Sequence, residues 1–365
     1  MKSVLFIIKN KMEYGHCHHH HHDHHHGHHG HHGDSCPISG GLFNSAKFVV
    51  EMLKDAGVKA HLSGVVDNND IDREVTKHKP DVCVIEALWV VPSKFDVLTR
   101  LHPNVEWLIR IHSKTPFLAQ EGVAIDWLLS YLRKRNVSLA FNSTEALADF
   151  STVIEGRQDV EGQLLYLPNY YPLDRLRMAP FDKPDSGIVN VGCFGSVRPF
   201  KNQLTQAVAA IKWANSLNKP MKFHINSSRV EQGGESAYRN LKSLFSGSRH
   251  HLVEYPWMTH GDFLKALNQN IDVGMQVAFT ESFNIVSADY VAAGLPMVVS
   301  PEISWSSKFS QASPNSAVDI ADTMKLVTSS PFKYISRYLN ELGLRHYSDK
   351  SKALWLAFLS ILGKY

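Results

Sequence analysis

Carboxylates and helix-start amides occur together in the segment Thr280–Ser300, TESFNIVSADYVAAGLPMVVS. An apolar strand pattern leads into a short loop, and a helical pattern begins just after Glu281. The first N–H groups of a helix lack intrahelical partners and lie at the positive end of its dipole, where phosphate binds. The segment therefore predicts an anion site made by four backbone amides, those of Ser282, Phe283, Asn284 and Ile285.

Two carboxylates of this segment are candidates for holding hydroxyl groups. Asp289 follows Glu281 at a distance that places it about one and a half turns into the helix. Ionised carboxylates accept hydrogen bonds from sugar hydroxyls, so the two could grip two parts of one ligand. Spacing alone leaves a second interpretation open, a capped helix with one exposed Asp.

A second candidate site lies in the segment Gly192–Gln203, GCFGSVRPFKNQ. A buried strand pattern ends at a glycine-containing loop that carries Ser196, Arg198 and Lys201 and opens onto a helix. Two cations beside a helix start suit a diphosphate, because they neutralise charge while the backbone donates hydrogen bonds. The loop matches neither GxGxxG nor a P-loop, so a strand–helix turn with solvated cations remains an alternative.

Both segments belong to a regular alternation of strand and helix patterns. The strand patterns lie at Val4–Ile8, Lys59–Val66, Asp81–Glu86, Trp107–Ile111, Val137–Phe141, Leu164–Leu167, Ile188–Phe194, Met221–Asn226, Ile271–Gln276 and Pro296–Ser300. Such alternation predicts doubly wound parallel sheets, and its restart near residue 188 predicts two Rossmann-like domains. We place these domains at 1–175 and 185–335, with two helical stretches after residue 330.

Composition is ordinary for a globular protein of 365 residues, with 44% hydrophobic and 20% charged residues. Residues 1–180 hold 19 Lys and Arg against 21 Asp and Glu, whereas residues 181–365 hold 19 against 14. The basic second part suits a phosphorylated ligand, although chance asymmetry explains it equally well. Scattered cysteines and the lack of a long apolar run predict a cytoplasmic protein without a membrane span, with Cys83 and Cys193 as reduced core thiols.

A histidine-rich stretch interrupts the pattern after the first strand. Residues 16–32 contain 13 of the 22 histidines and almost no apolar residue, so we expect a mobile loop over 16–33. Histidine tracts bind transition metals, which makes adventitious metal binding one expectation. A tolerated insertion without function is the plainer one.

Several of these motifs resemble those of the family-four retaining glycosyltransferases. The run ESFNIVSADYVAAGLPMVVS resembles the family's donor-site motif, and GSVRPFKNQ resembles its diphosphate loop. YLPN is similar to its strand end before the linker, and SGGLFNSAKFVVEML to its glycine loop and first helix. The resemblance implies the GT-B fold, in which two Rossmann-like doubly wound domains face each other across a cleft. It also implies that C-terminal helices within 336–365 cross back to the first domain.

The resemblance further implies roles for individual residues. Glu281 would hold hydroxyls of the transferred sugar, Asp289 the nucleotide ribose, and Arg198 and Lys201 the diphosphate. The departure from the family is Asp289, which stands where the family has Glu and reaches one methylene less far. His112 would touch the transferred sugar. The other residues implied on the donor side are Gly40, Gly41, Ser196 and the backbone amides of Ser282, Phe283, Asn284 and Ile285.

The implied reaction is retaining transfer from a nucleotide sugar, a UDP-sugar by preference, with no metal required. Asp70-Ile71-Asp72 formally matches the Asp-x-Asp metal motif of another glycosyltransferase fold, but we interpret it as acidic residues favouring a helix dipole.

The acceptor is predicted less directly. VEWLIRIHSKTPFLAQEGVAIDWL and VVDNNDID resemble glycosyltransferase-like proteins of bacteriophages, which implies a hydroxymethylated base in phage DNA and a host-cell cytoplasmic location. Asn142, Arg133 and Arg135 are candidate acceptor contacts, although the slightly acidic first domain argues against strong DNA binding. Glycan, lipid or protein acceptors, a nucleotide-sugar epimerase and a non-catalytic binding module remain open, as does the oligomeric state.

Overall fold

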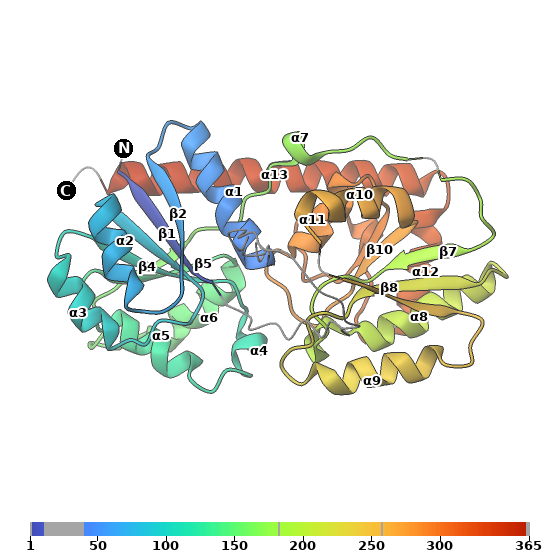
Figure 1. The fold of residues 1–365 in the computed structure, drawn as a ribbon, viewed down its shortest axis with the longest axis horizontal. Coiled ribbons are helices and arrows are strands. Elements are labelled where there is room, and N and C mark those ends of the chain that lie inside the picture. The colour runs from blue at the N-terminus through green and yellow to red at the C-terminus, as the bar shows by residue number, and fades with distance from the viewer. Residues whose placement is uncertain (1, 11–39, 182, 257, 363–365) are drawn as a thin grey trace, which may run out of the picture.

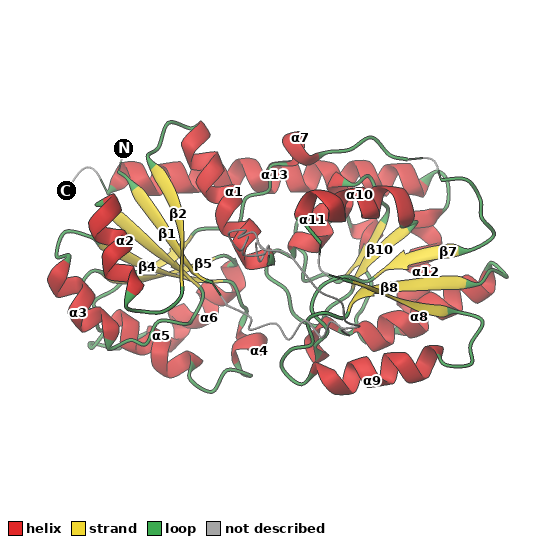
Figure 2. Cartoon of the chain, viewed as in Figure 1, coloured by secondary structure: helices red, strands yellow, loops and turns green. Residues whose placement is uncertain are grey.

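The computed structural model describes residues 2–10, 40–181, 183–256 and 258–362. Within these ranges the chain forms two α/β halves side by side, each with a parallel sheet between helices (Figures 1 and 2). The histidine-rich loop predicted at 16–33 lies outside the described residues, as do Cys17 and Cys36. Cys83 and Cys193 are buried and unpaired, and burial raises the pKa of the Cys193 thiol to about 12.

The first half contains a six-stranded sheet in the order β2-β1-β3-β4-β5-β6, with every described strand pair parallel. Its central strands are apolar on both faces because helices cover both sides. Its elements are β1 (Val4–Lys9), α1 (Gly41–Asp55), β2 (Ala60–Val65), α2 (Asp70–His78), β3 (Val82–Glu86), α3 (Lys94–Leu101), β4 (Glu106–Ile111), α4 (Thr115–Leu118), α5 (Ala124–Leu132), β5 (Val137–Phe141), α6 (Thr144–Ile154) and β6 (Leu164–Tyr166).

The second half contains a five-stranded sheet in the order β11-β10-β7-β8-β9, again parallel. The short helix α7 (Leu173–Leu176) lies in the linker between the halves. The elements after it are β7 (Val189–Gly192), η1 (Pro199–Lys201), α8 (Gln203–Ser216), β8 (Met221–Asn226), α9 (Gly234–Phe245), β9 (His251–Tyr255), α10 (His260–Asn270), β10 (Val273–Gln276), α11 (Ile285–Ala292), β11 (Met297–Val299), η2 (Lys308–Ser310) and α12 (Ala317–Thr328).

Each sheet has a point where the strand order reverses direction. In the first half the reversal lies between β1 and β3, and in the second half between β7 and β10. Loops leaving the carboxyl ends of such neighbouring strands diverge to opposite faces and leave a crevice that binds ligands. The candidate residues Lys201 and Glu281 follow β7 and β10, so the topology places both at the second crevice.

A long C-terminal helix joins the two halves. The two stretches expected after residue 330 are one helix, α13 (Phe332–Ile361), which runs along both halves in Figure 1. Leu344 packs into a core cluster of the second half, while Trp355 and Leu359 are buried in a cluster of the first. No proline interrupts the segment, so a single helix can bury both ends. Among the helices that the structure describes, none has the length and hydropathy needed to cross a membrane.

Gly343 lets α13 approach the second half closely, and its replacement tests this contact. A Cβ at residue 343 would lie 1.9 Å from the carbonyl oxygen of Trp305, so Gly343→Ala must displace backbone. We expect the free energy of unfolding to fall by about 1–3 kcal/mol in urea denaturation. Gly261→Ala, in the first turn of α10 with no atom near the added methyl, is the matched control and should not destabilise. Equal stability of the two variants would contradict the assigned packing.

Candidate functional site

The loops that follow β7 and β10 are joined by one backbone hydrogen bond and one from the Asn202 side chain. The Phe279 N–H donates to the Phe200 carbonyl at 2.9 Å, and Asn202 Nδ2 donates to the Val277 carbonyl at 3.0 Å. Asn202 sits in the left-handed region (φ 59°), where asparagine is tolerated better than most residues. These bonds keep the Lys201 and Glu281 backbones next to each other independently of the conformation of the two side chains.

The start of α11 presents unsatisfied backbone donors. Asn284 is its N-cap, and its side-chain oxygen accepts from the Ser287 N–H at 2.8 Å. Within the described chain, the N–H groups of Ser282, Phe283, Asn284 and Ile285 have no hydrogen-bond partner. One helix end thus offers four free donors at the positive end of its dipole.

The start of α1 meets the start of α11 at this point. A Cβ on Gly41, the first residue of α1, would lie 3.1 Å from Cγ2 of Ile285. Gly40 is the N-cap of α1, and no side chain caps that helix. The absence of a side chain at Gly41 lets the two helix starts converge from the two halves.

Lys201 and Glu281 form an ion pair through Nζ and Oε1. Only 13% of the Lys201 side chain and 10% of the Glu281 side chain are exposed. Since a covered charge is costly unless it is paired, each side chain stabilises the other in this state. Next to Glu281, the Thr280 hydroxyl is buried without a hydrogen-bond partner among the described residues.

Arg198 is not brought to this pair. Its guanidinium lies over the ring of Phe117 in α4, 4.7 Å from the centroid, and NH1 contacts Gln232 at 3.5 Å. In this structure the cation stacks on an aromatic ring of the first half, and its role toward a diphosphate stays a prediction. Its Nε is buried and has no partner in the described chain. Ser196 lies in the same loop, where its carbonyl accepts from Gln203 at 2.9 Å.

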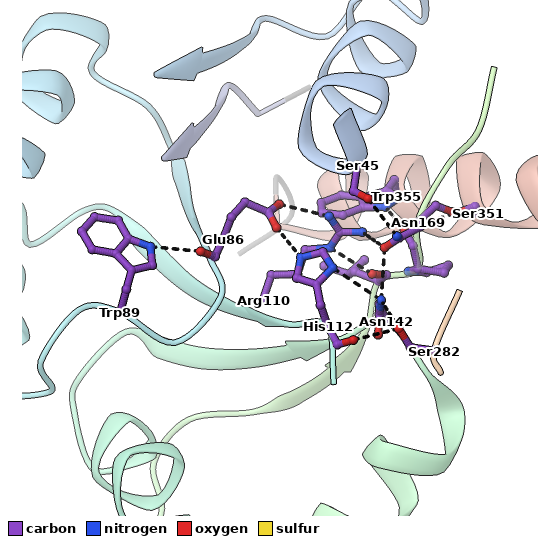
Figure 3. Close-up of polar contacts among 12 residues, drawn as sticks. Ser45, Glu86, Trp89, Arg110, His112, Asn142, Asn169, Ser282, Ser351 and Trp355 are labelled. Carbon is purple, nitrogen blue, oxygen red and sulfur yellow. Dashed lines mark hydrogen bonds and ion pairs between the residues drawn. The ribbon is translucent and has the colours of Figure 1, made fainter. Parts of the chain in front are cut away.

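Across the crevice, a buried polar network occupies the carboxyl edge of the first sheet (Figure 3). Glu86 ends β3, and its carboxylate accepts from Arg110 NH1 at 3.0 Å and contacts Nε2 of His112. Arg110 is fully buried and also donates to Asn169 at 2.8 Å, while its guanidinium lies 5.3 Å from the Trp355 ring centroid. The network therefore ties β3 and β4 to the linker and to α13.

The protonation states of this network follow from burial and charge. Burial would raise the pKa of Glu86, but the charge of Arg110 and the contacts with Arg110 and His112 lower it below its usual value. Burial lowers the pKa of His112, and the Glu86 charge does not offset this. A neutral His112 therefore donates its Nε2 proton to an ionised Glu86, which leaves Nδ1 as an acceptor.

Asn142 and Ser282 link the two halves by side-chain hydrogen bonds (Figure 3). Asn142 Nδ2 donates to Ser282 Oγ at 2.9 Å, and Ser282 Oγ donates to the His112 carbonyl at 2.8 Å. The Asn142 nitrogen also faces Asn169 Oδ1 at 3.3 Å. Its own Oδ1 is buried and unpaired among the described residues, so this side chain keeps one acceptor unused.

Asp289 is buried and already has two donors. The Tyr171 hydroxyl and His260 Nε2 each lie 2.7 Å from its Oδ1. Phe48 of α1 packs against both rings, at centroid distances of 5.5 Å from Tyr171 and 5.7 Å from His260. Burial would lower the pKa of His260, but the hydrogen bond and charge of Asp289 outweigh it and raise the pKa above 6.5.

Other predicted residues lie away from the crevice. The Phe283 side chain is in the core, stacked on Tyr347 with centroids 5.1 Å apart, although its N–H is one of the free donors at the start of α11. Arg133 and Arg135 precede β5, whereas Asn142 follows it, so the two arginines lie at the opposite edge of the sheet from the crevice. Arg133 is also paired with Asp159 at 2.7 Å. Their predicted contact with acceptor phosphates would therefore lie away from Asn142, and it stays a prediction.

The sequence reasoning missed Glu86, Arg110, Tyr171 and His260. A signal existed for two of them, since Glu86 and Arg110 are charged residues within otherwise apolar strand patterns. No group of three metal-ligating side chains occurs within the described ranges. Asp70 instead accepts the N–H groups of Val66 and Asp67, at 3.2 and 3.3 Å, at the start of α2.

Comparison with known proteins identifies the fold. No family model and no curated protein sequence matches the chain. It is similar in structure to the UDP-forming alpha,alpha-trehalose-phosphate synthase of Burkholderia vietnamiensis, with a TM-score of 0.68, 12% identity, and coverage of 100% of this chain and 97% of that one. It is also similar to the structure of trehalose-6-phosphate from E. coli bound with UDP-2-fluoro glucose, with a TM-score of 0.67, 10% identity, and coverage of 100% and 99%.

A third similar structure is the N-terminal domain of Candida albicans trehalose-6-phosphate phosphatase, with a TM-score of 0.69, 9% identity, and coverage of 99% and 97%. At such low identities these similarities establish the fold, and they confirm the predicted GT-B architecture of two Rossmann-like halves.

Glu86→Gln tests the buried network. The change removes the only carboxylate paired with a fully buried Arg110 in the described chain, so we expect the free energy of unfolding to fall by about 3 kcal/mol or more. Glu145→Gln is the matched control, because that side chain is exposed and 3.8 Å from Lys114, and it should cost less than about 1 kcal/mol. Urea denaturation compares the two, and similar losses would argue against a buried ion pair.

His260→Gln tests the pair with Asp289 through its pH dependence. A histidine whose pKa is raised on folding stabilises the folded state below its unfolded pKa, and this stability is lost as pH rises through the folded pKa. We expect the variant to be less stable than wild type at about pH 5.5, with a difference that shrinks above about pH 7.5. His251→Gln, at an exposed position of β9, is the control. A pH-independent difference would contradict the ion pair.

Proposed function

We propose that the chain is a retaining glycosyltransferase that moves a hexose from a UDP-sugar to a hydroxyl acceptor. The observation that carries the proposal is the start of α11, where four free amides adjoin the Lys201–Glu281 pair at the crevice of the second sheet. Support comes from the sequence resemblance and from the fold shared with a UDP-forming synthase and with a structure bound with UDP-2-fluoro glucose.

In this proposal the donor lies mainly on the second half. The amides of Ser282 to Ile285 and the Lys201 ammonium hold the diphosphate, since both provide positive charge to phosphate oxygens. Glu281 accepts hydrogen bonds from sugar hydroxyls beside Lys201, and Asp289 accepts from the ribose. Arg198 lies over the Phe117 ring, whereas Lys201 pairs with Glu281 just before α11, so we assign Lys201 as the principal cation.

The proposed transfer step uses no nucleophile from the protein. The bond from the sugar anomeric carbon to the diphosphate oxygen breaks, and a bond to the acceptor oxygen forms on the same face. The acceptor proton passes to the departing diphosphate. Lys201 and the amides stabilise the charge that develops on the leaving group, while His112, held by Glu86, touches the transferred sugar from the first half.

The finer proposal for the acceptor is a hydroxymethylated base in phage DNA. Its support is the resemblance of the first half to glycosyltransferase-like phage proteins. Asn142 is the proposed acceptor contact near the sugar, because it lies in the crevice beside Ser282. Arg133 and Arg135 could meet only a distant part of a DNA duplex, and salt-sensitive retention on hydroxymethylated DNA tests any such contact.

Incubation with a panel of sugar nucleotides, with and without hydroxymethylated DNA or simple sugar acceptors, tests the function by the mass of the products. Glycosylated product with release of UDP is the expected result. Lys201→Ala should lower turnover by about two to three orders of magnitude, the effect of removing one transition-state charge stabiliser. Lys212→Ala, an exposed lysine of α8, is the control.

The same panel separates the alternatives. Conversion of the donor without acceptor would identify an epimerase. Binding without turnover would favour a non-catalytic module. Either result contradicts transfer.

A further inference from the structure

The Lys201–Glu281 ion pair has a consequence for which ligand the crevice retains. Both side chains are largely covered, and within the described chain neither has another ion-pair partner. A ligand that binds the Lys201 ammonium competes with Glu281 for its N–H donors, and a ligand that draws Lys201 away leaves a covered carboxylate to be satisfied in some other way. An unpaired buried carboxylate costs more free energy than a paired one.

The two side chains can separate without moving the backbone. The Phe279–Phe200 backbone bond and the Asn202 bonds to the carbonyls of Val277 and Pro314 hold the loops together independently of the ion pair. Competition for Lys201 is thus a local exchange of side-chain partners.

A nucleotide sugar and its nucleoside diphosphate differ in what they offer to the pair. The diphosphate of either ligand binds Lys201, but only the sugar nucleotide also brings hydroxyl donors to Glu281. We propose that the Lys201–Glu281 pair makes the crevice select the intact nucleotide sugar over the nucleoside diphosphate left after transfer. This inference rests on the proposed function, and it assigns Glu281 a role in release of the spent nucleotide in addition to holding the sugar.

The pair acts as an internal competitor of the product. After transfer the sugar has left, so Glu281 regains Lys201 and the diphosphate loses its principal cation. With the sugar still attached, its hydroxyls occupy Glu281 and leave Lys201 to the phosphate. Selection thus comes from penalising the wrong ligand as well as from attracting the right one.

Calorimetric titration of UDP and UDP-glucose into wild-type protein and Glu281→Gln tests the inference. The wild type should bind UDP-glucose more tightly than UDP. The affinity of Glu281→Gln for UDP should be at least about tenfold higher than that of wild type, because no carboxylate competes for Lys201. Its affinity for UDP-glucose should stay the same or fall. Glu341→Gln is the matched control. It removes a partly buried carboxylate of α13 that pairs with Arg177 and Arg345, and it should leave the affinities for UDP and UDP-glucose unchanged.

A double variant shows whether the gain acts through the lysine. In the Lys201→Met background, Glu281→Gln should no longer improve UDP binding, because no cation remains to be freed. An improvement of equal size in both backgrounds would overturn the inference, and so would UDP binding by Glu281→Gln no tighter than by wild type. Wild-type protein that binds neither UDP nor UDP-glucose would overturn the proposed function and this inference with it.

Discussion

The positive start of α11 is the constraint around which the second half is arranged. Four N–H groups in succession, from Ser282 to Ile285, have no partner in the described chain. Asn284 takes the left-handed conformation and caps Ser287, so the helix uses its own side chain for a later donor and leaves the first ones open. Such a helix start favours an anion, and Lys201 adds a positive charge next to it through its pair with Glu281.

Positioning this helix end against the first half depends on polar contacts that apolar packing alone would not specify. Ser282 contacts both Asn142 and the His112 carbonyl, and Lys114 of the first half pairs with Glu302 of the second at 2.9 Å. Next to these contacts, the buried Glu86 and Arg110 form an ion pair, and the Arg110 guanidinium lies over the ring of Trp355 in α13. Buried charges are costly unless every partner is in place, so this network favours one relative placement of the halves.

Much of this architecture was predictable, because alternating strand and helix patterns are local properties of the sequence. Strand β5 (Val137–Phe141) and strand β8 (Met221–Asn226) have the predicted bounds, and Lys201 and Glu281 were expected at neighbouring strand ends. Helices α3, α6, α9 and α12 were not predicted. Contacts between distant segments, such as Glu86 with His112 and Asp289 with Tyr171, have no local signal. Arg198 could not be placed either, because Phe117 comes from the other half.

Asp289 illustrates how a departure from a motif can be compensated by its surroundings. A carboxylate one methylene shorter than the Glu it resembles reaches less far and sits deeper in the protein. Tyr171 from the linker and His260 from the start of α10 both bind its Oδ1, and within the described residues no hydrogen bond reaches Oδ2. The two donors therefore fix the carboxylate and leave its second oxygen without a hydrogen bond among the described residues. Since Phe48 of α1 packs on both donor rings, the orientation of this oxygen depends on contact between the halves.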